Sequence, residues 1–154
     1  MKVAFPYANH ESIEIPCTAS AVRYNFLNNV ADKLQNKYIV GIAAHHVNTT
    51  TITPGNANVV NDTVFRKTYV TLSWADQERV SSWSLPTLQF AQTAAASAYV
   101  NGFTPLNFLQ INFYKSYVSV ANAAGLVAGE AFLLSFWYVN TVPAAYKPML
   151  EFNK

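Results

Sequence analysis

One stretch near the end of the chain decides the fold: Phe132-Leu133-Leu134-Ser135-Phe136-Trp137-Tyr138-Val139. Every second residue from Phe132 to Tyr138 is a leucine or an aromatic residue, and the positions between them include Ser135 and Trp137. Side chains point alternately to the two faces of a β-strand, so a period of two indicates a strand rather than a helix. Aromatic and β-branched residues also suit a pleated, half-buried surface.

The same period of two recurs at residues 12–17, 38–44, 69–74 and 109–113. In residues 38–44 both faces are apolar, which indicates a strand that is buried on both sides. The phase breaks after Phe113, because Val118 and Val120 resume on even positions. We therefore expect a bulge or bend near Lys115-Ser116 that re-aims one continuous strand. The residues expected in the core are Val40, Ile42, Leu72, Ile111 and Leu134.

Two segments have helical features. Residues 20–35 place Leu27, Val30 and Leu34 at helix-like spacing, although Val22, Tyr24 and Phe26 also alternate as in a strand. Residues 89–101 contain an alanine-rich run that ends at Gly102, a suitable position just past a helix end. We expect one or two short helices from these segments.

Many strand patterns and few helical ones predict an all-β fold, a single antiparallel β-sandwich of the jelly-roll type. The length of 154 residues suits one domain. We expect extended arms at both termini, about residues 1–10 and about residues 141–154. Pro143 and Pro148 in the second arm favour an extended backbone.

The composition is poor in charge, since 51% of the residues are hydrophobic and only 12% are charged, against roughly 25% in an ordinary soluble domain. This balance excludes intrinsic disorder and a coiled coil. The net charge of +2 comes from scattered basic residues, so no nucleic-acid partner is expected. Residues 118–139 carry one charge, Glu130, and a strand, a glycine-containing loop and a second strand explain them better than a membrane span.

Catalytic and metal-binding patterns are weak. His45 and His46 are adjacent, so on a strand they point to opposite faces and do not readily chelate one metal. Cys17 lies on the apolar side of its strand pattern, as expected for a buried structural thiol. A β-sandwich hydrolase would need Asp76, Glu78 and Glu130 to converge in one cleft. We predict no enzymatic activity, no cofactor and no metal.

A series of segments, taken in order, resembles small all-β virion proteins of tailed and icosahedral bacteriophages. A leucine with basic residues leads into an Ile-Val-Gly-Ile strand, and a closing aromatic strand completes the series. The segments are residues 32–42, 67–72, 84–88, 110–118 and 133–138. The resemblance implies a jelly-roll-like capsid or capsid-auxiliary protein with neither activity nor cofactor, and it assigns no catalytic residue.

The function predicted from these observations is a structural subunit of a bacteriophage particle, made in the host cytoplasm and located in the virion. It would be a capsid, capsid-auxiliary (decoration) or vertex protein that contacts other virion proteins and copies of itself as a homo-oligomer. The surface agrees, because Asn, Thr, Ser and Tyr replace charges there. The expected contact residues are Thr51, Pro54, Asn56, Arg66, Lys67, Tyr146, Pro148, Leu150 and Phe152.

The alternative is a carbohydrate- or receptor-binding β-sandwich module of a virion fibre or tail. Its platform for stacking sugars would come from the aromatic residues, which more often fill a core or an interface. The candidates are Tyr7, Trp74, Trp83, Tyr114, Tyr117, Trp137 and Tyr146.

Overall fold

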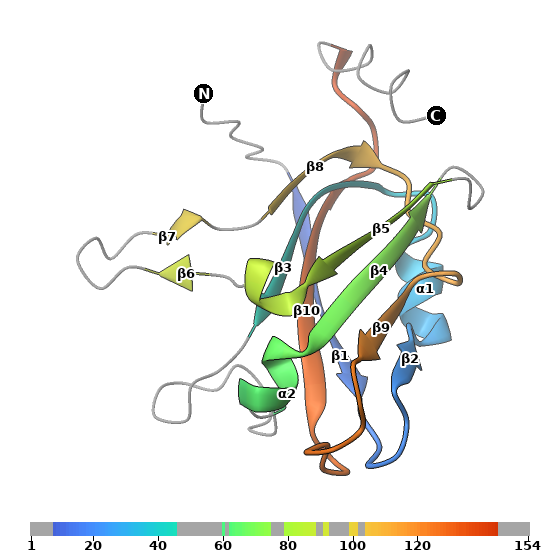
Figure 1. Cartoon of the computed structure of the whole chain (residues 1–154). Coiled ribbons are helices and arrows are strands. Elements are labelled where there is room, and N and C mark those ends of the chain that lie inside the picture. Colours follow the sequence, from blue (N-terminus) through green and yellow to red (C-terminus); the bar gives the residue numbers. More distant parts are fainter. Residues whose placement is uncertain are drawn as a thin grey trace.

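The computed structural model describes residues 8–45, 60, 62–74, 79–88, 91–92, 99–101 and 104–144. Two four-stranded antiparallel sheets pack face to face (Figure 1). Sheet A contains, in spatial order, β1 (Asn9–Pro16), β10 (Ala131–Val139), β3 (Tyr38–His45) and β8 (Thr104–Leu109). Sheet B contains β2 (Arg23–Asn25), β9 (Tyr117–Val120), β4 (Thr68–Trp74) and β5 (Arg79–Ser84).

The strand order is that of a jelly roll. Counted along the chain, the eight sandwich strands fall as first, eighth, third and sixth in sheet A, and as second, seventh, fourth and fifth in sheet B. This order folds the chain back on itself, so that its first and last strands pair along their whole length, from Asn9↔Tyr138 to Pro16↔Ala131. The predicted all-β sandwich is confirmed, and it is a jelly roll.

Aromatic rings join the two sheets. Phe136 of β10 meets Phe113 edge-on at 5.2 Å between ring centroids and Phe26 at 6.0 Å. Tyr24 of β2 packs on Phe132 at 5.5 Å. All five rings are buried, and tilted or edge-to-face pairs of this kind are favourable beyond the area that they bury. Four of the expected core residues, Ile42, Leu72, Ile111 and Leu134, are buried in this core, whereas Val40 is buried in a second cluster outside it.

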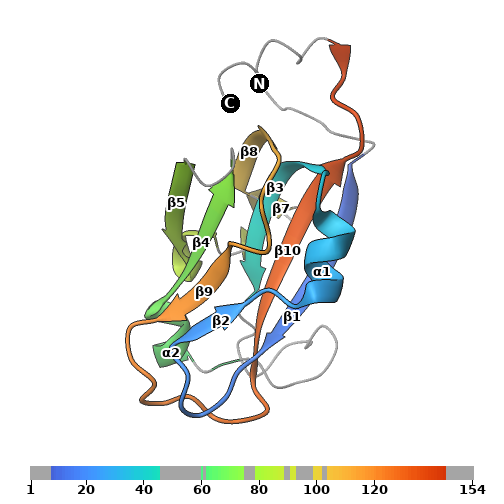
Figure 2. The ribbon, with the colours of Figure 1, turned by 90° about the vertical axis from the view of Figure 1, so that its right-hand side faces the viewer.

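Short helices close the open sides of the sandwich. Helix α1 (Asn28–Leu34) lies beside β1 and β2 (Figure 2) and buries Ala31 and Leu34. On its outer side, Lys33 forms an ion pair of 2.7 Å with Glu11 of β1. The 3-10 helix η1 (Leu85–Leu88) buries Leu85 and Leu88 between β3 and the β4–β5 pair. A further short helix, α2 (Asp62–Arg66), precedes β4.

The helical expectations were partly wrong. In residues 20–35 only the second half is helical, because residues 23–25 form β2 and place Tyr24 in the core. In residues 89–101 the described parts are strands, β6 (Ala91–Gln92) and β7 (Tyr99–Asn101), which pair as a hairpin. The alanine-rich run itself, residues 93–98, lies outside the described residues.

The strand expected across residues 109–120 is interrupted. Leu109 ends β8 in sheet A, Phe113 lies in a turn, and β9 begins at Tyr117 in sheet B. The change of phase at Lys115-Ser116 falls in the turn before β9, where the expected bend lies. The passage of the chain from sheet A to sheet B comes earlier, between Leu109 and Ile111, because Ile111 already bridges Trp74 of β4 and the Asn112 N–H donates to the Ser73 oxygen at 2.8 Å. Both sides of this passage are apolar because both belong to the same core.

An irregularity in sheet A creates a second apolar cluster on the outer face of this sheet. Phe108 has a φ of 53°, and the pairing of β3 with β8 shifts between Ile39 and Gly41. As a result Leu109 points into the main core while Phe108 packs outside it with Val40 and Val142. Val142 belongs to the expected C-terminal arm, so at this residue the arm packs on its own domain, while residues 141, 143 and 144 are exposed. Asn9 and His10, expected in the N-terminal arm, begin β1.

Candidate interaction surfaces

The expected contact residues fall mostly outside the described residues. Those in the loop (Thr51, Pro54 and Asn56) and those in the tail (Tyr146, Pro148, Leu150 and Phe152) are not described. Arg66 and Lys67 are described, and both are exposed where α2 ends and β4 begins. The structure therefore gives a position to the basic pair alone. It also offers three surfaces that the sequence analysis did not isolate.

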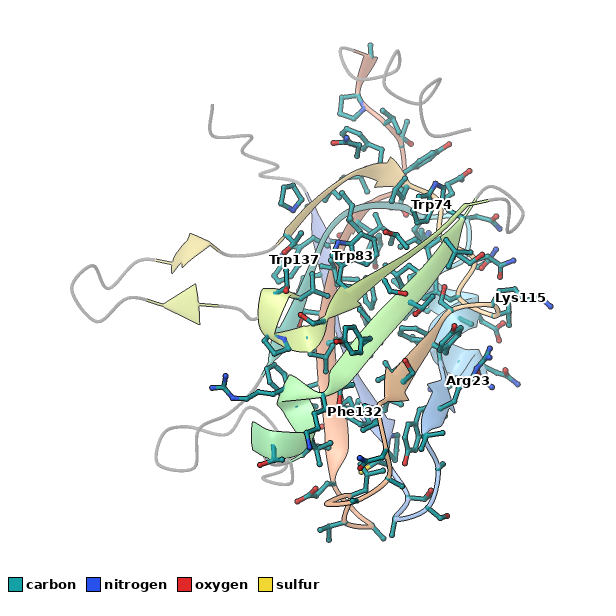
Figure 3. The ribbon with its side chains drawn as sticks, in the orientation of Figure 1. Arg23, Trp74, Trp83, Lys115, Phe132 and Trp137 are labelled. Carbon is teal, nitrogen blue, oxygen red and sulfur yellow. The ribbon has the colours of Figure 1, made fainter. Side chains whose placement is uncertain are left out.

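The first surface is the outer face of sheet B, which is rich in hydroxyl groups. Strand pairing sets Tyr69 beside Ser84 and Ser119, and Thr71 beside Ser82 and Tyr117. Arg23 is the one charged side chain that the described residues place on this face, and its guanidinium lies 3.7 Å from the centre of the Tyr117 ring (Figure 3). Such a contact contributes about 0.5–1 kcal/mol at an exposed site.

Hydrogen bonds hold the side chains of this face in place. The hydroxyls of Thr71 and Ser82 lie 2.7 Å apart, and those of Ser84 and Thr87 lie 2.6 Å apart. Tyr69 is 46% exposed and Val80 is 58% exposed. The outer face of sheet B is thus an ordered polar surface with one exposed tyrosine and one exposed valine.

The second surface is the outer face of sheet A, which is buried at its centre. Ala43 and Ser135 are buried although they point away from the core, and Ser135 shares a hydrogen bond of 3.0 Å with Ser12. Beside them the tilted ring of His10 packs against the ring of Trp137, with 4.7 Å between the ring centroids. Of the three histidines, His10 alone has a described side chain.

The third surface, called the loop end below, consists of residues 17–22 between β1 and β2 and residues 121–129 between β9 and β10. These segments contain no charged residue, and all of them except Cys17 and Leu126 are at least partly exposed. Both loops lie together at the lower end of the sandwich in Figure 1. Their exposed apolar side chains include Val22 and Val127, the latter 54% exposed.

The charge-free character of this region could have been read from the sequence. Between Val80 and Tyr146 the chain has only two charged residues, Lys115 and Glu130. The single charge in residues 118–139 is part of this longer run, which begins at residue 81. This run supplies β8, β9, β10 and the β9–β10 loop, and therefore much of both outer faces and of the loop end.

The residues considered for catalysis and metal binding are only partly described. The described residues contain no cluster of three or more His, Cys, Asp or Glu side chains that could hold a metal ion. Of the three carboxylates considered for a hydrolase, Asp76 and Glu78 lie outside the described residues, while Glu130 is half-buried just before β10. No described helix is long and apolar enough to cross a membrane, and residues 118–139 form the expected strand, loop and strand.

Three ionisable groups have shifted pKa values. Burial raises the pKa of the Cys17 thiol, and the nearby Glu130 carboxylate raises it further. The thiol donates hydrogen bonds to the backbone oxygens of Glu130 and Val127, as expected for a structural cysteine. The hydrogen bond from Tyr114 to Asp32 raises the pKa of the phenol, and the contact with Glu11 raises the pKa of Lys33.

Comparisons with protein-family models, with curated proteins and with solved structures found no match to this chain.

Proposed function

We propose that this chain is a structural subunit of a bacteriophage particle, without enzymatic activity, that assembles through protein–protein contacts. The role would be that of a capsid, capsid-auxiliary or vertex protein. The observation that supports the proposal best is the jelly-roll strand order of sheets A and B. Viral capsid domains are one major use of this architecture, together with lectins and cupins.

The surface favours the structural role among these uses. The exposed surface combines an uncharged loop end with a sheet face of hydroxyls and tyrosines, and this composition suits wet protein–protein contacts. Since a fold alone does not assign a function, the phage context depends on the order of segments described in the sequence analysis.

Light scattering coupled to size-exclusion chromatography tests the assembly. The purified full chain should form oligomers whose mean mass rises with concentration. Sequencing the genes beside this one provides the second test, because portal, capsid or tail genes are expected there. A chain that stays monomeric at high concentration and does not bind other virion proteins would overturn the proposal.

A second candidate is a glycan-binding module, which the outer face of sheet B favours. Tyr69 offers a half-exposed ring, and the ordered hydroxyls of Ser82, Ser84 and Thr87 can exchange hydrogen bonds with sugar hydroxyls. A glycan array probed with the wild-type chain and with Tyr69→Ala tests it. Signals that disappear in the variant would support this function, and an array without hits would reject it.

A further inference from the structure

The loop end is held rigid from within. The Tyr24 hydroxyl donates to the backbone oxygens of Thr18 and Ala21, at 2.6 Å and 2.8 Å, and accepts from the Thr18 N–H at 3.1 Å. These bonds fix the β1–β2 loop around a buried ring. An exposed surface that is already ordered loses little conformational entropy when a partner binds.

The two loops are also bonded to each other. The Cys17 N–H donates to the Glu130 oxygen at 2.9 Å, and the Val120 N–H donates to the Val22 oxygen at 2.8 Å. Leu126 is buried beneath the β9–β10 loop and anchors it. The loop end is therefore one preorganised surface with Val22, Val127 and several alanines on its outside, whereas exposed loops are ordinarily polar.

The absence of charge indicates what could bind there. Within residues 17–22 and 121–129 a charged partner would lose hydration without finding an opposite charge, which is unfavourable. At the border of the loop end, charged residues include Glu130 and Lys67, whose backbone oxygen accepts from the Ala121 N–H. A second loop end meets no such penalty, and in a two-fold contact the same patch from each copy faces itself.

We propose that the loop end, residues 17–22 and 121–129, is a contact surface for a second copy of this chain. The proposal rests on the structural role proposed above and names one of the contacts that such a role requires. The surface offers about half of the 20–30 residues that each partner gives to a standard interface. A single contact should therefore be weak and depend on concentration, while repeated contacts in an assembly strengthen one another.

The experiment compares two exposed valines that receive the same charge. Val127→Asp places a carboxylate in the loop end, and Val80→Asp places one on the outer face of sheet B, where the parent residue is similarly exposed, 58% against 54%. Sedimentation equilibrium of the full chain gives the dissociation constant for each. We expect Val127→Asp to weaken self-association more than tenfold, because an unpaired charge in a contact costs more than about 1.4 kcal/mol, and Val80→Asp to leave it unchanged.

The dependence of self-association on salt concentration provides an independent test of the proposed contact. A contact without charges is not screened, so wild-type self-association should persist or strengthen as the ionic strength rises. Equal effects of the two substitutions, or none from either, would overturn the loop end as the contact while leaving the structural role intact. A wild-type chain that remains monomeric overturns this inference. If that monomer still binds other virion proteins, the proposed function survives, and if it binds none, both fail.

Discussion

The outer faces of the two sheets differ although both sheets have four strands and share one core. On sheet A, Ala43 and Ser135 are buried, and Phe108 and Val40 join a second apolar cluster. On sheet B, Thr71 and Ser73 of the central strand β4 are buried as well, but Tyr69 and Val80 are exposed. The outer face of sheet A thus carries a second apolar cluster, whereas the outer face of sheet B keeps a large aromatic and a large aliphatic side chain that a partner or a ligand can reach. A jelly roll gains different surfaces in this way without changing its strand order.

The largest expected effect comes from adding the same charge to both faces. Ser135→Asp should lower the free energy of unfolding by about 3 kcal/mol, because the carboxylate has to be buried without a compensating charge. Ser82→Asp, which also replaces a hydrogen-bonded serine, should change it by less than about 0.5 kcal/mol, because the side chain reaches water. Urea denaturation measures both. Similar values for the two variants would mean that the outer faces do not differ as described.

A pair of valines sharpens the same comparison without charge. Val40→Ala should cost about 2 kcal/mol, since it removes buried methyl groups from the second cluster on sheet A. Val80→Ala should cost less than about 0.5 kcal/mol, because Val80 is exposed on sheet B. Thermal unfolding monitored by circular dichroism separates the two results. A small effect at Val40 would show that the second cluster does not contribute to stability.

A smaller effect is expected from the stacked arginine of sheet B. Arg23→Ala should cost about 0.5–1 kcal/mol through loss of the contact with the Tyr117 ring. Lys115→Ala removes another exposed basic side chain and serves as the control for the change in net charge. If urea denaturation gives the same value for both, the stacking contributes nothing measurable.

The smallest expected effect is a loss of stability at alkaline pH, caused by Cys17, which follows β1 at the end of sheet A. The folded chain holds the Cys17 proton more tightly than the unfolded chain, because burial raises the pKa of the thiol. The stability linked to this group is complete below the unfolded pKa of about 8.5, and it is lost as the pH rises above that value. In Cys17→Ala the free energy of unfolding, measured by urea denaturation, should fall less steeply as the pH rises above this value. In Ser82→Asp it should fall as steeply as in the wild-type chain. An unchanged slope in Cys17→Ala would assign the decline to other groups.

Part of the fold could be predicted because period-two patterns report burial directly. The segments that contain β1, β3, β4 and β10 stand out in this way, and their buried residues were named correctly. Strands β2 and β5 were not predicted as such. Strand β2 has three residues and directly precedes a helix, while β5 reads Arg-Val-Ser-Ser-Trp-Ser, with little apolar alternation. Short or polar strands acquire their conformation from pairing with a neighbour, which a local pattern does not contain.

The candidate surfaces were less predictable than the fold. The basic pair Arg66-Lys67 was expected to be exposed, and it is. The loop end escaped notice because its two segments are about a hundred residues apart in the chain and become one surface through the bonds from Cys17 to Glu130 and from Val120 to Val22. The run from Val80 to Tyr146 with two charges was a usable signal, but it does not say which of its residues would be exposed.

The sequence by itself determined most of the core residues and the class of fold, because both depend on the local alternation of apolar residues. It also determined the low fraction of charged residues, which is a matter of composition. Only the tertiary structure decided that the chain changes sheets between Leu109 and Ile111, that Phe108 packs outside while Leu109 packs inside, and that two uncharged loops adjoin. Each of these follows from pairing between distant segments. Such pairing selects among the conformations that local preferences allow, and no short stretch of sequence contains both partners.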